Sequence, residues 1–151
     1  MTAVRFLTSD DIAELASPAE YVSAVRNGYR ERGNGAPAEP RTRLDSADPL
    51  GFLTGYFAIL PEMGAMGGYT YAAGFGHRDA QFVLPLFDAE SGELLAILDG
   101  ASMNPSKTGA TGGVGVDELA RSDATEVGLV GSGTQARGQL LATATVRNLD
   151  H

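Results

Sequence analysis

The sequence predicts an α/β fold, in which an α+β region over residues 1–121 precedes one further strand and helix over residues 122–151. Three patterns support this prediction. Apolar residues recur at helical spacing after Ser17, apolar runs on both sides of residues 88–92 are typical of a β-hairpin, and a glycine-rich turn near Gly131 joins an apolar run to a helical pattern. Together they place helices on both sides of a β-rich middle.

Two helix-start signals stand near the N-terminus. Thr8 to Asp11 and Ser17 to Glu20 each place an acidic residue three positions after a hydroxyl residue, which is the pattern of a capping box. In the second signal Pro18 falls at the first helical position, where a backbone N–H has no intrahelical partner in any case. The apolar spacing then predicts a helix that continues to Gly33, a residue type that commonly ends helices.

The middle of the chain is expected to form a sheet. Residues 34–40 contain two prolines and should be irregular, bringing the chain to Arg41 in an extended conformation. The expected strands cover residues 52–60 and 66–73, followed by the hairpin strands 82–87 and 93–98. Pro85 lacks a backbone N–H, so we expect its strand to lie at a sheet edge or to contain a bulge.

Residues 103–120 carry two opposed signals. Their end is helix-like, with Val116, Leu119 and Ala120, yet glycines stand at positions 109, 112, 113 and 115. Each glycine costs a helix about 1 kcal/mol relative to alanine. Either a neighbouring element packs closely on this segment, or the segment is less regular than a helix.

The glycine turn follows a short apolar run, Val127 to Val130, which is expected to be a strand. Gly131 to Ala136 fits the pattern G-x-G-x-x-G/A of dinucleotide-binding Rossmann units, in which the first glycine permits the turn and the second admits a pyrophosphate. Ala136, Leu140 and Ala144 then lie on one helix face. The alternative is a plain tight turn. One strand and one helix cannot enclose a dinucleotide, so we expect residues 122–151 to be the first piece of a longer domain.

Composition narrows the function classes. A net charge of −8 argues against a non-specific nucleic-acid binder. No apolar run reaches the length of a membrane helix, and the first residues have no signal-peptide pattern, so we expect a cytoplasmic protein without a membrane partner. The two histidines, His77 and His151, have no ligand partner at metal spacing, so no metal site is expected. Residues 74–79 are either an active-site loop or a plain turn.

The order of these motifs resembles the ornithine cyclodeaminase/mu-crystallin family, which also includes alanine dehydrogenases and cyclic-imine reductases. The resemblance rests on Phe6–Ile12, Pro40–Arg41, Leu86–Ala96, Leu98–Gly100 and Gly131–Arg137. It implies an enzyme of roughly twice this length that uses NAD or NADP, acts on a small amino or imino acid, and forms a homodimer. Residues 1–121 would then be the substrate-binding and dimerisation domain, and residues 122–151 the start of the NAD(P)-binding domain.

The resemblance also suggests site residues. Arg41 matches the carboxylate-binding arginine of the family, although Arg43 lies close enough to compete for that assignment. Lys107 stands where many members have arginine, and Tyr69 stands where members have a substrate-site lysine. The residues matching cofactor-binding positions are Gly131, Ser132, Gly133, Thr134, Gln135, Ala136 and Thr108.

One further departure affects the expected activity, because Asp79–Ala80–Gln81 stands where the family has a Thr-His-Gln element. By the same resemblance, the catalytic aspartate of the family lies beyond residue 151. The activity implied is that of an ornithine cyclodeaminase, an alanine dehydrogenase or an imine reductase. Two alternatives remain open: a non-catalytic ligand-binding or dimerisation module like mu-crystallin, which the loss of the lysine would permit, and an inactive gene remnant.

Overall fold

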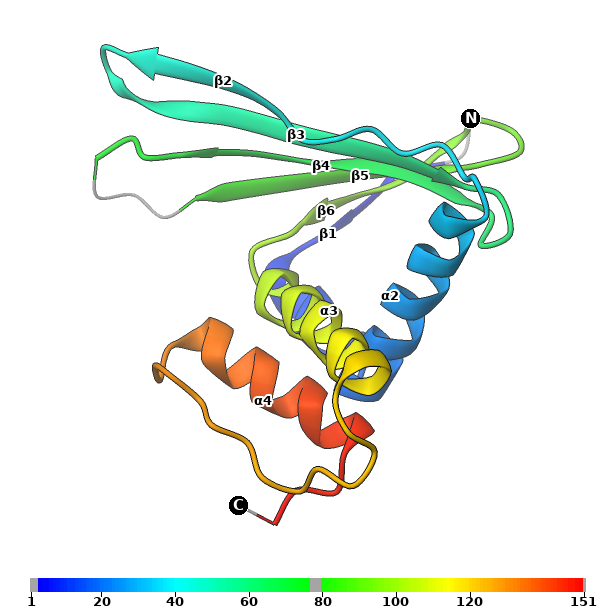
Figure 1. Ribbon diagram of the computed structural model, residues 1–151. Coiled ribbons are helices and arrows are strands. Elements are labelled where there is room, and N and C mark those ends of the chain that lie inside the picture. Colours follow the sequence, from blue (N-terminus) through cyan, green and yellow to red (C-terminus); the bar gives the residue numbers. More distant parts are fainter. Residues whose placement is uncertain (1–2, 77–79, 151) are drawn as a thin grey trace. The chain divides into compact units, whose positions relative to one another are not determined.

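The computed structural model describes residues 3–76 and 80–150, and its elements follow the chain in the order shown in Figure 1. The chain divides into two compact units. The sheet unit comprises Met1–Ile12 and Arg30–Ala101, and the helical unit comprises Ala13–Tyr29 and Ser102–His151. His77 and Asp79, singled out from the sequence, and His151 lie outside the described residues.

The sheet unit is built on a six-stranded sheet with the order β1-β6-β5-β4-β3-β2. β1 runs parallel to β6, and all other neighbours are antiparallel. The strands are β1 (Arg5–Leu7), β2 (Thr42–Ala47), β3 (Leu50–Leu60), β4 (Ala65–Ala73), β5 (Gln81–Asp88) and β6 (Leu94–Asp99). The four strands predicted from the sequence are therefore confirmed.

The sequence did not indicate the two edge strands. β1 has only three residues, which is too short for an alternating pattern. β2 carries polar residues on both of its faces and is almost wholly exposed, so it has no apolar face to signal a strand. Its place at an edge explains this composition, because an edge strand needs only one hydrogen-bonded neighbour and charged side chains protect its open side.

Pro85 does not lie in an edge strand, so that alternative is wrong. β5 is an interior strand between β6 and β4. The irregularity expected as the other alternative is present one residue later, because the register between β5 and β6 shifts between Leu86 and Phe87. The sheet thus accommodates the missing N–H of the proline with a local break in the ladder.

The sheet has two chemically different faces, because residues directly opposite in an antiparallel pair share a face. The tyrosine face carries Thr54, Tyr56, Tyr69, Tyr71, Phe82, Leu84 and Leu86. The phenylalanine face carries exposed apolar residues, namely Phe6, Leu53, Phe57, Ile59, Val83 and Leu95.

Both capping boxes form as predicted. Helix α1 (Ser9–Ala13) begins after Thr8, whose backbone N–H donates to Asp11 Oδ2 over 2.8 Å. Helix α2 (Pro18–Gly33) begins after Ser17, whose backbone N–H donates to Glu20 Oε2 over 2.8 Å. These hydrogen bonds lower the pKa values of both carboxyl groups, because they favour the ionised forms.

In the helical unit, residues 103–119 form one regular helix, α3 (Met103–Leu119), which packs on α4 (Thr134–Val146). Close packing therefore explains the glycines at positions 109, 112 and 113, whereas a Cβ at Gly115 would meet no atom within 4 Å. A Cβ atom at Gly109 would lie 2.2 Å from the carbonyl oxygen of Gly138, and one at Gly138 would lie 2.3 Å from that of Pro105. Val22 of α2 completes the core of this unit with Ala110 and Ala142.

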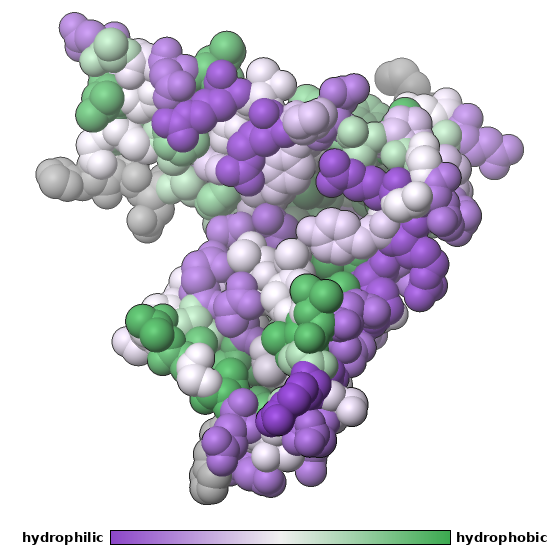
Figure 2. All heavy atoms as spheres, viewed as in Figure 1, coloured by the Kyte–Doolittle hydropathy of each residue, from purple (hydrophilic) through white to green (hydrophobic). Residues whose placement is uncertain are grey.

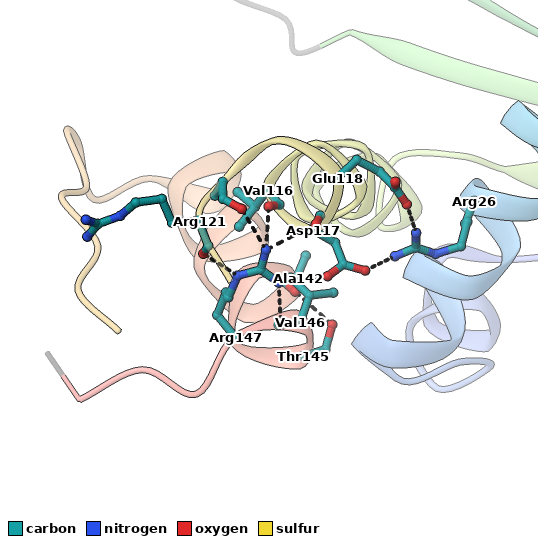
Figure 3. Close-up of polar contacts among 10 residues, drawn as sticks. Arg26, Val116, Asp117, Glu118, Arg121, Ala142, Thr145, Val146 and Arg147 are labelled. Carbon is teal, nitrogen blue, oxygen red and sulfur yellow. Dashed lines mark hydrogen bonds and ion pairs between the residues drawn. The ribbon is translucent and has the colours of Figure 1, made fainter. Parts of the chain in front are cut away.

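A guanidinium group connects the ends of these two helices by hydrogen bonds (Figure 3). Arg147 follows α4, and its side chain is only 9% exposed. It donates to Asp117 Oδ1 over 2.7 Å, to the backbone carbonyl oxygens of Val116 and Asp117 in the last turn of α3, and to those of Ala120 and Arg121 just after it. Asp117 also pairs with Arg26 of α2, so one carboxylate links all three helices.

Residues 127–130 are not a strand, and this prediction is wrong for the described chain. The segment has no regular structure, and Val130 is 101% exposed. The physical reason is the lack of a partner: an extended segment becomes a strand only by pairing, and no described strand of the helical unit lies beside it.

Candidate functional site

Arg41 lies above an aromatic surface on the tyrosine face of the sheet. Its guanidinium carbon is 5.3 Å from the ring centre of Tyr56 and 5.8 Å from that of Tyr71. These are cation–π distances, and such stacking fixes a guanidinium without using the N–H donors at its edge. Arg41 is exposed and has no carboxylate partner within residues 3–76 and 80–150. It can therefore bind an external anion, and a planar carboxylate suits its fork of donors.

Arg43, the competing arginine, has different surroundings. It forms an ion pair with Asp45 at 2.7 Å and stacks on Phe52, with its guanidinium carbon 3.9 Å from the ring centre. Its charge is thus already matched by a carboxylate of the same strand. Of the two arginines, the contacts favour Arg41 as the anion-binding residue.

Tyr69 is part of the interior and not of the exposed surface. It is 3% exposed, and its hydroxyl donates to the carbonyl oxygen of Gly100 over 3.1 Å. Burial, followed by the nearby Tyr56, Tyr71 and Asp99, raises the pKa of its phenol. A ligand beside Tyr69 would therefore meet a neutral aromatic ring.

The sequence analysis did not predict the aromatic surface as a whole. Ring centres of Tyr69 and Tyr56 lie 5.6 Å apart, those of Tyr69 and Phe82 5.2 Å, and those of Tyr71 and Phe82 4.8 Å. The signal was available as the alternation Tyr69-Thr70-Tyr71, which places both tyrosines on one face of a strand. The partners on β3 and β5 depend on register, which the sequence did not fix.

Lys107 and Thr108 lie in the first turns of α3, beside the first half of α4. The carbonyl oxygen of Thr108 accepts a hydrogen bond from Gln139 Nε2 over 3.2 Å, and the adjacent Gly109 packs on Gly138. Lys107 is partly buried. The two positions are thus held near the segment that enters α4.

The glycine turn has the expected backbone. Gly131 has a φ of +100°, a conformation that a side chain disfavours, and Gly133 is the residue before α4. No side chain caps this helix start, and a Cβ at Gly133 would meet no atom within 4 Å. Ser132, Thr134 and Gln135 are exposed, and Ala136 is partly buried. The N–H groups of the first turn are therefore open to a ligand.

The buried face of α4 is not the face that carries Ala136, Leu140 and Ala144. Gly138, Ala142 and Thr143 are its buried residues, whereas Leu140 is 38% exposed. Close packing on α3 selects the smallest residues of the helix for contact and leaves Leu140 outside. Figure 2 shows apolar surface in the lower part of the view, over α4 and the segment before it, where Leu129, Val130 and Leu141 are also exposed.

The structure thus groups the predicted residues in two sets. Arg41 and Tyr69 belong to the sheet unit, and Lys107, Thr108 and Gly131–Ala136 belong to the helical unit. Within the described ranges there is no cluster of three or more residues suited to hold a metal ion. No helix among those residues is long and apolar enough to span a membrane.

Comparisons with known proteins identify the family of this chain. The sequence profile of the ornithine cyclodeaminase/mu-crystallin family matches residues 3–151. A Δ1-pyrroline-2-carboxylate reductase of Bacillus cereus is 35% identical over 75 residues, which are 50% of this chain and 23% of that protein. Alanine dehydrogenase of Archaeoglobus fulgidus is 30% identical over 148 residues, covering 93% of this chain and 44% of that protein.

A solved structure is similar over nearly the whole chain. Δ1-pyrroline-2-carboxylate reductase of Thermococcus litoralis, in complex with NADH and L-proline, superposes with a TM-score of 0.87 at 29% identity. The match covers 97% of this chain and 47% of that one. The chain therefore spans less than half the length of each of these three relatives.

Proposed function

This chain belongs to the ornithine cyclodeaminase/mu-crystallin family, and on that premise we propose that it forms part of an NAD(P)-dependent enzyme acting on a small amino or imino acid. The reaction class is hydride transfer at the carbon that bears the nitrogen, as in an alanine dehydrogenase, an imine reductase or a cyclodeaminase. The observation that carries the proposal is Arg41, held over two tyrosine rings with its donors available. Residues 1–121 bind substrate, and residues 122–151 open the cofactor domain.

The substrate side of this proposal assigns the carboxylate to Arg41. The guanidinium is already oriented by Tyr56 and Tyr71, so binding costs little side-chain entropy. Lys107, in the helical unit, stays a predicted substrate-binding residue on the ground of the family resemblance alone. Tyr69 contributes its ring and not a proton, because its hydroxyl is bonded to Gly100 and its pKa is raised.

The cofactor side assigns the phosphates of NAD or NADP to the turn Gly131 to Ala136, with Thr108 close by. The residues fit such a group, since the start of α4 is uncapped and the space at Gly133 is open. The bound dinucleotide would accept or donate the hydride. The protein residues position both ligands and keep the substrate carboxylate in place.

The cofactor assignment is tested by titrating the 15N-labelled 151-residue chain with NADH. We expect the amide resonances of Gly131 to Ala136 to shift, and Gly133→Val to abolish these shifts because a side chain blocks the approach of the phosphate. Gly128→Val is the matched control, because a Cβ at Gly128 also meets no atom within 4 Å. Absence of shifts in the unmodified chain, or equal shifts in Gly133→Val, would contradict the assignment.

We also propose a homodimer that forms through the phenylalanine face. Phe57 is 56% exposed on this face and Val83 50% exposed, and large exposed apolar surfaces commonly mark interfaces. One relative of known structure, an archaeal alanine dehydrogenase, is described as a dimer with bound NAD. Sedimentation should show a dimer that Phe57→Asp dissociates and Leu119→Asp, at a site 88% exposed in the helical unit, leaves intact. A monomer at all concentrations would contradict this part.

A non-catalytic ligand-binding module is the second candidate. Tyr69 favours it, because a buried, hydrogen-bonded phenol replaces the lysine that the family resemblance implies. Such a module would bind amino acids and NADH without hydride transfer. A full-length protein that binds both ligands but shows no change in nicotinamide absorbance with any amino or imino acid would establish that it is a non-catalytic binding module.

A further inference from the structure

Beside the Arg41 site, the tyrosine face has a pocket of about 230 Å³. Its main lining residues are Tyr56, Leu60, Gly67, Tyr69, Leu84 and Leu86. All of them belong to the sheet unit, so the pocket does not depend on the helical unit for its walls. The volume is below the range of about 300–1,000 Å³ that drug-sized ligands occupy, and it therefore suits a group as small as an amino-acid side chain.

Tyr56 connects the pocket to Arg41. Its ring lies under the guanidinium, 5.3 Å from the guanidinium carbon, and also forms part of the pocket wall. A ligand whose carboxylate is bound by Arg41 can therefore direct its side chain past the Tyr56 ring into the pocket. The two features then act on the two ends of one small molecule.

The pocket offers no charge to a ligand side chain. Among the described residues its lining contains aliphatic, aromatic and glycine residues and one methionine, Met66. Tyr69 contributes a ring whose hydroxyl is already donated to Gly100. A distal ammonium group would lose its hydration there and gain no counter-ion, which is costly, whereas a branched aliphatic side chain would bury apolar surface.

We propose that Arg41 and this pocket select an α-amino or α-imino acid with a branched aliphatic side chain and discriminate against diamino acids. This inference rests on the proposed function, because it assigns the substrate class of the same carboxylate site. It makes Leu84 and Leu86 specificity-determining residues, since they shape the pocket without contacting the carboxylate.

The test is a titration of the 15N-labelled 151-residue chain with L-leucine, L-alanine and L-ornithine. We expect L-leucine to bind at least about tenfold more tightly than L-ornithine. It should also bind at least about tenfold more tightly than L-alanine, because its side chain buries several more apolar carbon atoms in the pocket. Shifts should concentrate at Tyr56, Leu84 and Leu86. Arg41→Gln should abolish binding, and Arg43→Gln, the matched control two residues further along the chain, should leave it unchanged.

Two variants separate the pocket from the arginine. Leu84→Ala should reduce the affinity for L-leucine towards that for L-alanine, by about tenfold. Tyr56→Leu should weaken all three ligands together, because it removes the ring under Arg41. Circular dichroism of each variant identifies loss of folding, and Arg41→Gln, at an exposed position, keeps the test valid if the Leu84 variant unfolds.

The results of these titrations distinguish the proposed substrate class from the proposed function. Equal or tighter binding of L-ornithine, still dependent on Arg41, would overturn the substrate class and leave the carboxylate site standing. Binding of no ligand, or binding that survives Arg41→Gln, would overturn both. The NADH titration reports on Gly131 to Ala136 separately, so failure of the substrate class is distinguishable from failure of the cofactor assignment.

Discussion

The sheet unit and the helical unit reach their packing by opposite means. In the sheet unit, large rings stack on one another, with Tyr69 in contact with Tyr56 and Phe82. In the helical unit, contact depends on the absence of side chains, because α3 meets α4 through Gly109 and Gly138. Large side chains can adjust to a small change, whereas two backbones in contact cannot. We therefore expect the helical unit to be the less tolerant of substitution.

The largest expected effect on the free energy of unfolding is at Arg147, which follows α4 and binds the end of α3. Arg147→Ala removes hydrogen bonds to Asp117 and to carbonyl groups at the end of α3, and it removes a side chain that is only 9% exposed. We expect the free energy of unfolding to fall by about 3 kcal/mol. Urea denaturation measures this loss. Arg121→Ala is the control, because the Arg121 side chain is 83% exposed and its pair with Asp123 is 3.6 Å long.

Hydrogen exchange shows whether this loss stays local. If the two units unfold separately, Arg147→Ala should accelerate exchange in α3 and α4 and leave β3 to β5 unchanged. Equal acceleration in both units would show that they unfold together. The two units would then differ in packing only, and not in stability.

The next effect is at the glycine contact. Gly109→Ala places a Cβ atom against the carbonyl of Gly138, so we expect a loss of about 1–3 kcal/mol in the free energy of unfolding. Gly115 lies in the same helix, and a Cβ there meets no atom within 4 Å. Gly115→Ala should therefore stabilise the protein by up to about 1 kcal/mol. If Gly109→Ala and Gly115→Ala both destabilised the protein, the expected gain in helix propensity at position 115 would be wrong, whereas the contact at Gly109 would not be contradicted.

A smaller effect is expected in the sheet unit. Tyr69→Phe keeps the ring stack and removes the hydroxyl that donates to Gly100, so the free energy of unfolding should fall by about 1 kcal/mol. Tyr71→Phe serves as the comparison, because it also preserves a ring of the same cluster. Thermal unfolding of both variants measures the difference. An effect of Tyr69→Phe as large as that of Arg147→Ala would contradict the contrast between the units.

The smallest effect concerns pH. Hydrogen bonds from Arg147 and then Arg26 lower the pKa of Asp117 from its ordinary value of 3.8. Because the folded-state pKa lies below the unfolded value, this carboxylate stabilises the fold above the unfolded pKa, and the contribution disappears as the pH falls through the folded pKa. The Asp117 side chain is 35% exposed, so we expect less than about 1 kcal/mol. Asp117→Asn should flatten the acid limb of a plot of stability against pH, below the ordinary pKa of 3.8.

The sequence predicted local features well where a short pattern determines them. Thr8 and Ser17 marked two helix starts, and residues 88–92 marked a hairpin, because capping and turn chemistry depend on neighbours a few positions away. The family resemblance came from the same kind of short pattern and is confirmed by the profile match.

Features that depend on distant partners were missed. Residues 127–130 have strand composition but no strand beside them, and β2 forms a strand despite its polar composition because β3 pairs with it. The aromatic surface under Arg41 required the register of three strands, and the face of α4 that is buried required knowledge of where α3 packs. The site assignments made from the sequence remain predictions for the titrations described above.

The exposed segment before the glycine turn can report on assembly in terms of exchange rates. Among the described residues, no backbone hydrogen bond involves residues 127–130, whereas α4 begins at Thr134. Amide protons should therefore exchange fast up to the turn and slowly soon after it. A strand or partner molecule that pairs with residues 127–130 would slow their exchange selectively, so the position of this boundary measures directly whether the segment is paired with a neighbouring strand.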